Sequence, residues 1–455
     1  MKHRQHGDKL LLILMFTLII SAMSALMFNF TLTDISKEYH ITTAQVSWVT
    51  SIYGLIYGIG TVFYGKMADQ YRLKNLITFG LLFFTVGSLI GLGSTSFWMV
   101  LAARSVQALG ASVIPAISML IPIRYFAPEN RGVATGTIVV GLSLGNALGP
   151  IISALIVEFT HWRWLFFIPV FIVIVIPFYR KYLDDEQLLK NRKTDWIGGF
   201  MLSLTVTSIL LWITNGSWWY SLIGCVTLLL FIVRIHKSSN PFIQPVLFRN
   251  KDYVVGLGIS FLVNGMCTAI YFVIPLLLAN VQQLQAGWIG FVMVPAAAVS
   301  ALLGRYGGKI VDTKGNKPLF TIASCLLMVF FGAISILIGS SPYVIAILLI
   351  FGFLGQSYMM LSISNSISRT LPYDQVGVGM GFLMMLNFIA GSIGTGIYAK
   401  IVDIDAKVAI IPIQLYGPSI IYSNIFTLLV LLQLVTLMIY YLSQYVFQKR
   451  KVSHL

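Results

Sequence analysis

The segment Gly65-Lys66-Met67-Ala68-Asp69 recurs in this chain as Gly308-Lys309-Ile310-Val311-Asp312, 243 residues further on. Each copy closes a long apolar run, and a lysine follows at the same offset, Lys74 after the first copy and Lys317 after the second. Self-similarity of this kind indicates an internal repeat. The chain is therefore expected to contain two related halves.

The apolar runs around these segments predict a membrane protein built from helices. Of the 455 residues, 57% are hydrophobic and only 10% are charged, whereas soluble domains carry roughly one quarter charged residues. A continuous apolar run of about 18 residues or more crosses a hydrocarbon layer of about 30 Å as a helix. The runs do not alternate as barrel strands do, so we expect an all-α polytopic protein. Fourteen spans are predicted, at residues 10–32, 46–65, 75–95, 98–122, 133–157, 162–182, 196–214, 218–236, 254–278, 288–305, 318–338, 342–366, 376–400 and 420–446.

The basic residues support this number of spans and predict an orientation. With the N-terminus in the cytoplasm, four of the 30 Lys and Arg residues lie on the outer side and Arg104 lies within a span. The other 25 lie in cytoplasmic loops and tails, as the positive-inside rule requires. We therefore expect a multi-pass protein of the cytoplasmic membrane with both termini in the cytoplasm. The four outer residues are Lys37, Arg163, Lys400 and Lys407.

Eight predicted spans separate the two repeated segments, which defines the expected domain organisation. Residues 1–195 form an N-terminal six-helix half and residues 237–455 a C-terminal one, with two additional helices inserted at 196–236. Parallel halves around a central cavity are an architecture of secondary transporters, whose substrate site lies near the midplane.

Other classes of protein are disfavoured. The net charge of +15 is spread over loops and is not gathered on one face, so no nucleic-acid partner is expected. The three cysteines all fall within spans without metal-binding or disulfide spacing. The chain has no HExxH, GxSxG or phosphate-loop motif, which argues against an enzyme. We expect no metal and no cofactor.

The two repeated loops resemble those of the major facilitator superfamily, in which the loop after the second span carries a Gly, an Asp and basic residues at this spacing. The second copy, with Gly308, Asp312 and Gly315, is closer to the family pattern than the first. The resemblance implies a major-facilitator fold and a gating role for Gly65, Asp69, Gly308 and Asp312. The alternative is that the charged residues of these loops only anchor the helices at the membrane surface.

In the fifth predicted span, Gly136, Gly145, Gly149 and Pro150 are similar to the motif that marks antiporters among the major facilitators. The Gly-Gly pair that usually follows is replaced here by Ser153-Ala154. Glycines four residues apart allow a neighbouring helix to approach closely, and Pro150 removes one backbone hydrogen bond, which permits a kink. Ordinary close packing of helices is the alternative interpretation of this spacing.

In the fourth span, Arg104, Gln107 and Gly110 resemble a third family motif, with Ala108 where a glycine would be usual. A charge at this depth, roughly 9 Å from the predicted outer end at the helix rise, is costly unless it is paired or hydrated. We therefore expect Arg104 to face the interior and to pair with a carboxylate near the outer helix ends, either Asp34 or Glu158.

Together, the length, the fourteen spans and these motifs resemble the fourteen-span drug:proton antiporter branch, which includes tetracycline, quaternary-ammonium and multidrug efflux pumps of Gram-positive bacteria. The stretch Ser24 to Met27 lacks the deep acidic residue of many such pumps, and Met380 to Ala399 contains no acid either. The expected proton carriers are therefore Asp34 and then Glu158, with Arg104 stabilising the deprotonated form.

The expected function is proton-coupled efflux of small lipophilic drugs, cationic or zwitterionic. A dedicated tetracycline:proton antiporter and a facilitator or importer of a small metabolite are the alternatives. The expected partners are drugs and the lipid bilayer, and the oligomeric state stays open. A drug pocket is expected to be mostly apolar with a few polar groups; the candidate residues are Tyr53, Tyr57, Asn146, Asn264, Tyr271, Gln356, Tyr358, Met359, Met384 and Asn387.

Overall fold

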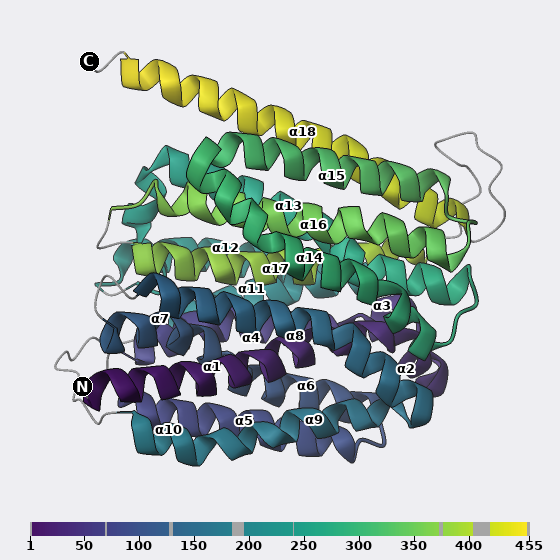
Figure 1. Cartoon of the computed structure of the whole chain (residues 1–455), viewed down its shortest axis with the longest axis horizontal. Helices are drawn as coiled ribbons and strands as arrows, with labels where there is room; N and C mark the ends of the chain where they lie inside the picture. The colour runs from purple at the N-terminus through teal and green to yellow at the C-terminus, as the bar shows by residue number, and fades with distance from the viewer. Residues whose placement is uncertain are drawn as a thin grey trace. The chain divides into compact units, whose positions relative to one another are not determined.

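A computed structural model describes residues 2–68, 71–126, 131–183, 195–239, 241–372, 376–403 and 419–452 (Figure 1). The described residues form helices and connecting turns, without a strand. By its internal contacts the chain divides into two compact units, Met1–Gln244 and Pro245–Leu455, which we call unit 1 and unit 2.

Unit 1 begins with the long helix α1, and short 3-10 turns interrupt its first and sixth spans. Within it, α5 lies beside α9 and α10 (Figure 1). Its helices are α1 (Lys2–Leu26), η1 (Met27–Phe30), α2 (Leu32–Tyr39), α3 (Thr43–Val46), α4 (Trp48–Met67), α5 (Leu73–Leu92), α6 (Phe97–Ala111), α7 (Val113–Tyr125), α8 (Arg131–Phe159), η3 (Trp162–Phe166), α9 (Phe167–Val170), η4 (Phe171–Val175), α10 (Ile176–Tyr182), α11 (Trp196–Asn215) and α12 (Trp218–Lys237).

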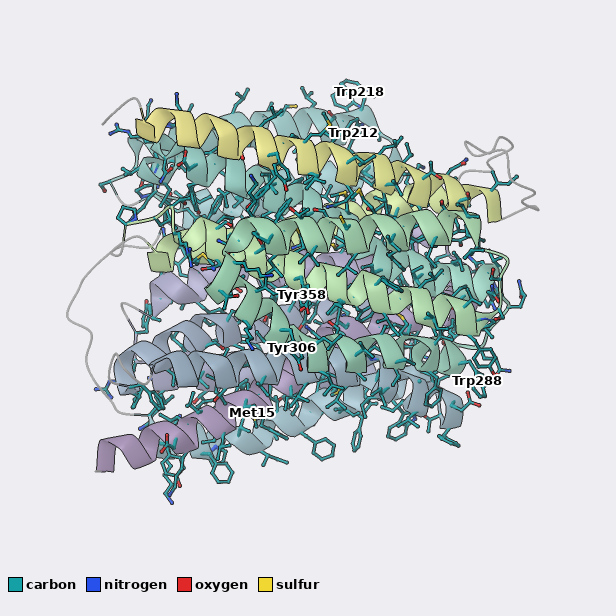
Figure 2. The ribbon with its side chains drawn as sticks, turned by 45° about the horizontal axis from the view of Figure 1, so that its top comes forward. Met15, Trp212, Trp218, Trp288, Tyr306 and Tyr358 are labelled. Carbon is teal, nitrogen blue, oxygen red and sulfur yellow. The ribbon has the colours of Figure 1, made fainter. Side chains whose placement is uncertain are left out.

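Unit 2 contains six long helices after one 3-10 turn. Tyr306 and Tyr358 lie near each other on two of them, α14 and α16 (Figure 2). The elements are η5 (Pro245–Arg249), α13 (Lys251–Asn280), α14 (Ala286–Lys314), α15 (Asn316–Ile336), α16 (Pro342–Ser368), α17 (Val376–Val402) and α18 (Ser419–Val452). The turn between α14 and α15 needs Gly315, because its φ of +83° with ψ near 180° is a conformation open only to glycine.

Fourteen segments within the described residues are long and apolar enough to cross a membrane. The predicted all-α fold with fourteen spans is thereby confirmed. The division into two halves and a two-helix insert stays a prediction, since the contacts give two units, with α11 and α12 in the first.

The first span differs from the continuous helix predicted at 10–32, because regular α-helix ends at Leu26. The carbonyl groups that this break frees find side-chain donors: the Ser153 hydroxyl of α8 donates to Met27 O at 2.9 Å, and the Thr31 hydroxyl donates to Phe28 O at 3.2 Å. A buried carbonyl in an apolar environment requires such a partner. Ser153 thus compensates for the break in the neighbouring helix.

Helices α1 and α8 approach each other closely along the glycine face of α8. A Cβ atom on Gly145 would lie 2.7 Å from Ala22 Cβ and from Ile19 O, and one on Gly141 would lie 3.1 Å from Met15. Gly149 is less tightly packed, with its nearest neighbour, Leu26, at 3.5 Å. Lipid provides no hydrophobic drive between helices, so this contact depends on van der Waals packing of small residues.

A second close contact joins α5 to α6. A Cβ atom on Gly110 would collide with the backbone of Phe84, and one on Gly87 would collide with the backbone of Gln107. Glycine is therefore required on both helices at this contact. It fixes the position of α6, which carries Arg104.

The segment from α11 to Pro241 contacts α4 near both ends of that helix. At one end Trp48 Nε1 donates to Thr214 Oγ1 of α11 at 3.3 Å, and at the other Lys66 Nζ donates to Pro241 O, beyond α12, at 2.6 Å. Phe63 of α4 stacks on Trp196 at a ring distance of 5.0 Å. Near the turn between α11 and α12, Trp212 and Trp218 are exposed (Figure 2).

We expect Gly145→Ala to destabilise the protein by about 1–3 kcal/mol, the usual cost of overpacking. The added methyl group would have to push backbone of α1 away. The check is thermal unfolding of purified protein in one detergent.

Gly149→Ala is the matched control, since its methyl group would meet neighbours at ordinary contact distance. Equal melting temperatures for the two variants would contradict the asymmetric packing of α8 on α1.

Candidate functional site

Arg104 of α6 is entirely buried in unit 1 and joins α6 to α1 and α4. Its Nε donates to Val49 O at 3.1 Å, and its Nη1 donates to Ser24 O at 3.2 Å. The guanidinium carbon also lies 4.5 Å from the centre of the Phe28 ring and 3.9 Å from that of Tyr53. Such cation–π contacts contribute up to about 2 kcal/mol when desolvated. The interior placement expected for Arg104 is therefore what the structure has.

Gln107, one helical turn further along α6, holds the guanidinium in place. Its Oε1 accepts a hydrogen bond from Arg104 Nη1 at 2.7 Å, and its Nε2 donates to Ser88 Oγ of α5 at 2.8 Å. The Ser88 hydroxyl in turn donates to Phe84 O. The backbone of Phe84 is also the part of α5 that packs against Gly110 of α6. The three residues of the predicted motif thus act together, because Gly110 permits the contact that brings Ser88 within reach of Gln107.

The ion pair expected between Arg104 and Asp34 or Glu158 is not formed, and that expectation is wrong for this structure. All the hydrogen bonds that Arg104 makes within the described residues go to carbonyl oxygens of the backbone or of Gln107. Glu158 is exposed, and Asp34 lies beyond the break in the first span, on α2.

A different carboxylate, Glu38, is paired at the distal end of unit 1, which we define as residues 31–42, 93–96 and 159–166. Arg163 Nη2 donates to Glu38 Oε1 at 2.6 Å, and Trp162 Nε1 donates to Glu38 Oε2 at 2.6 Å. Arg163 Nε also donates to Ser94 O at 2.6 Å. These bonds tie together the three connections that follow the first, third and fifth spans.

Asp34 and Glu38 lie one turn apart on α2 but have opposite electrostatic environments. Burial raises the pKa of Asp34 above its usual value, although Lys37 and His161 act against this. For Glu38, burial also acts upward, but the hydrogen bonds from Arg163 and Trp162 and the charges of Arg163 and His161 prevail and lower its pKa.

Several predicted gating residues can be located only in part. Asp69 lies outside the described residues, and for Asp312 the structure describes only the backbone, in α14. Gly136, Gly145 and Pro150 all lie on α8. Gly65 and Gly308 have no neighbour within 4 Å of an added Cβ, so close packing does not explain glycine at either position.

The candidate drug-binding residues fall in both units. In unit 1, Tyr53 stacks on Tyr57 at a ring distance of 5.8 Å, and Asn146 is exposed on α8. In unit 2, Ser260 donates to Asn387 Oδ1 at 2.7 Å and Tyr358 donates to Leu303 O at 3.0 Å. Tyr271 packs edge-on against Phe353, and Met359 is entirely buried. Asn264, Gln356 and Met384 are partly exposed. Their role in binding stays a prediction.

A family model described as the Major Facilitator Superfamily matches residues 14–395. The chain belongs to the Major Facilitator Superfamily. It is therefore a multi-pass membrane transporter, and the family predicted from the repeated loops is confirmed.

Three known proteins illustrate what this major facilitator is similar to. The riboflavin transporter RibZ of Clostridioides difficile (strain 630) is 26% identical over 399 residues, covering 86% of this chain and 87% of RibZ. The lincomycin resistance protein LmrB of Bacillus subtilis (strain 168) is 26% identical over 389 residues, covering 82% of this chain and 81% of LmrB. The crystal structure of the human organic anion transporter MFSD10 (TETRAN) matches with a TM-score of 0.66 at 13% identity, covering 95% and 99% of the two chains. The last likeness shows only a shared fold.

Sequence reasoning missed Glu38 and Ser153 as residues that organise unit 1. Glu38 could have been found, because it precedes the second span on the same predicted side as Arg163, and short connections on one side bring opposite charges together. No signal in the sequence identifies Ser153 as the partner of Met27, because that contact depends on where α1 breaks.

We expect Asp34→Asn and Glu38→Gln to change stability in opposite directions at about pH 7. Because the pKa of Asp34 is raised, this residue favours the folded state at pH values below its pKa in the unfolded chain, and this stabilisation is lost as pH rises. At neutral pH the charged carboxylate is therefore unfavourable, and Asp34→Asn should increase the free energy of unfolding. Because the pKa of Glu38 is lowered, its charged form stabilises the folded state at pH values above its pKa in the unfolded chain. Glu38→Gln should therefore decrease the free energy of unfolding, by about 1 kcal/mol or less because the ion pair with Arg163 is partly exposed.

Melting temperatures measured from neutral pH down to about pH 3 would check both signs. The difference between Asp34→Asn and the wild type should disappear as pH falls through the raised pKa of Asp34. The difference for Glu38→Gln should disappear only at lower pH, as pH falls through the lowered pKa of Glu38. A stabilising Glu38→Gln or a destabilising Asp34→Asn at neutral pH would contradict the environments described for these carboxylates.

Proposed function

We propose that this transporter exports small lipophilic drugs, cationic or zwitterionic, across the cytoplasmic membrane in exchange for protons. Both termini are assigned to the cytoplasm, and the distal end of unit 1 to the outer face. The tetracycline-specific pump is a narrower form of the same proposal, and a susceptibility profile limited to tetracycline would favour it.

The observation that carries the proposal is the glycine face of α8. Gly145 packs against α1 at a distance that excludes a side chain, and it belongs to the motif by which the sequence resembles antiporters. The lincomycin resistance protein LmrB, among the similar relatives, supports a drug as the cargo. A tight α1–α8 contact keeps unit 1 rigid, as expected of a body that moves as a whole during alternating access.

For the proton, we assign the main role to Asp34 and a second role to Glu158. A carboxyl group carries protons between two sides when its environment changes enough to shift its pKa across the working pH. Burial already raises the pKa of Asp34, and Lys37 and His161 provide charges whose influence varies with distance. Glu38 is not assigned this role, because Arg163 and Trp162 hold its charged form.

The test measures drug-dependent proton release from everted vesicles with an internal pH probe. With an imposed gradient, drug addition to wild-type vesicles is expected to alkalinise the lumen as protons leave. Asp34→Asn should reduce this signal to that of vesicles without the transporter, because the amide cannot release a proton. Glu158→Gln should give a partial loss.

Glu38→Gln is the matched control, an acid-to-amide change one turn away on α2 that should keep the exchange. Full proton release from both Asp34→Asn and Glu158→Gln would overturn the assignment of the carriers. Drug movement without any proton flux in the wild type would overturn the exchange itself.

A second candidate, uptake of a small metabolite, is favoured by the similarity to the riboflavin transporter RibZ. Riboflavin is a flat aromatic molecule of drug-like size, so an apolar pocket with a few polar groups would suit it as well as a drug.

Uptake of labelled riboflavin into proteoliposomes would separate the two functions. If the protein is an exporter, riboflavin should not accumulate in the absence of a pH gradient. When a pH gradient is imposed, drugs should compete with riboflavin for efflux. Gradient-independent riboflavin entry that drugs do not inhibit would favour the importer.

A further inference from the structure

The permanent positive charge of Arg104 lies in the interior of unit 1, and no described residue forms an ion pair with it. A guanidinium group stays protonated in proteins, so the charge cannot be removed by releasing a proton. The carbonyl and ring contacts of Arg104 compensate it in part, but none of them carries a formal negative charge. An isolated buried charge costs several kcal/mol.

The sequence offers no acid at the depth of Arg104. Three acidic residues fall within the fourteen spans, namely Asp8, Glu158 and Asp252, and each is the second residue from an end of its span. Arg104 is the eighth residue of a 19-residue span. The missing negative charge therefore has to come from outside the membrane-spanning part of the chain.

Arg104 and residues in contact with it carry buried polar groups that have no hydrogen-bond partner within the described part of the chain. Arg104 Nη2, with two N–H donors, has no hydrogen-bond partner, and neither do the hydroxyl groups of Ser24 and Tyr53. Both are neighbours of Arg104: Nη1 donates to the backbone carbonyl of Ser24, and the Tyr53 ring lies 3.9 Å from the guanidinium carbon. Ser21, one turn before Ser24 on α1, has a hydroxyl group beside that of Tyr53, but the two do not meet in hydrogen-bond geometry. All four residues are at least 98% buried.

We infer that Arg104 Nη2, Ser24 Oγ and Tyr53 OH form a binding site for a small monovalent anionic group. These donors match a carboxylate or a halide ion, since both accept several hydrogen bonds and neutralise the charge. A water molecule would satisfy the donors but leave the charge, so it accounts for less of the arrangement. The anionic group belongs either to the cargo, as the carboxylate of a zwitterionic drug, or to a free anion such as chloride.

The cargo source rests on the proposed export function, so binding is measured without transport. The probes are a fluoroquinolone acid and its carboxyl ethyl ester, which differ in charge but share the ring system. Wild-type protein in nanodiscs, in chloride-free gluconate buffer, should bind the acid at least about ten-fold more tightly than the ester, as a charge-assisted hydrogen bond to Arg104 requires. Arg104→Gln should abolish this preference, whereas Arg163→Gln, the matched arginine of the distal end, should keep it.

Tyr53→Phe provides a second test in case Arg104→Gln does not fold, because it removes one hydroxyl group of the site and keeps the aromatic ring. It should weaken binding of the acid about three- to ten-fold and leave the ester unchanged. Chloride separates the two sources. If chloride raises the melting temperature of the wild type but not of Arg104→Gln, and the acid and ester bind equally, the site takes a free anion.

Equal binding of acid and ester without any chloride effect would overturn the inference, as would an acid preference or chloride effect that persists in Arg104→Gln. A protein that prefers the acid but shows no proton flux in vesicles would sink the exchange mechanism alone. The two failures are thus distinguishable.

Discussion

Direct backbone contact between helices is the constraint on which unit 1 depends. Lipid is as apolar as the side chains it surrounds, so helices in a membrane gain little from hiding leucine. What holds them is contact at short range, and here that contact is made by Gly145 of α8 on α1 and by Gly87 and Gly110 between α5 and α6. These contacts set the positions of the helices that surround Arg104, so its environment follows from residues that carry no functional group.

The break in the first span follows from the same contacts. Once α8 lies against α1, Ser153 can donate to the carbonyl of Met27, and regular α-helix can end there without leaving that group unsatisfied. In the family motif the corresponding position is usually glycine, which has no hydroxyl to donate. The break in turn moves Asp34 onto the separate helix α2. One serine thus helps to define where the first helix ends and the helix that carries Asp34 begins.

The sequence predicted the large features because they depend on sums over many residues. Fourteen apolar runs, the distribution of lysines and arginines and the repeat of Gly65–Asp69 at Gly308–Asp312 each tolerate local errors. The glycine face of α8 was predicted as well, because a four-residue spacing places Gly145 and Gly149 together on any helix. The partners of Arg104 were not predicted, because they depend on where the first helix ends and on how α1, α4 and α6 cross. Glu38 and Asp34 are a turn apart on α2, yet only the three-dimensional positions of Arg163 and Trp162 separate their properties.

Under the proposed export of drugs, the charge of Arg104 also bears on which drugs would suit unit 1. At an effective dielectric constant of about 20, a cation held about 8 Å from the guanidinium would be repelled by about 2 kcal/mol. A zwitterion avoids this cost when its negative end faces Arg104, and a purely cationic drug avoids it only by binding farther away. The stacked rings of Tyr53 and Tyr57 would otherwise attract cations, but the face of Tyr53 is already in contact with Arg104. Electrostatics within unit 1 therefore favours cargo that carries a negative group over cargo that carries only a positive one.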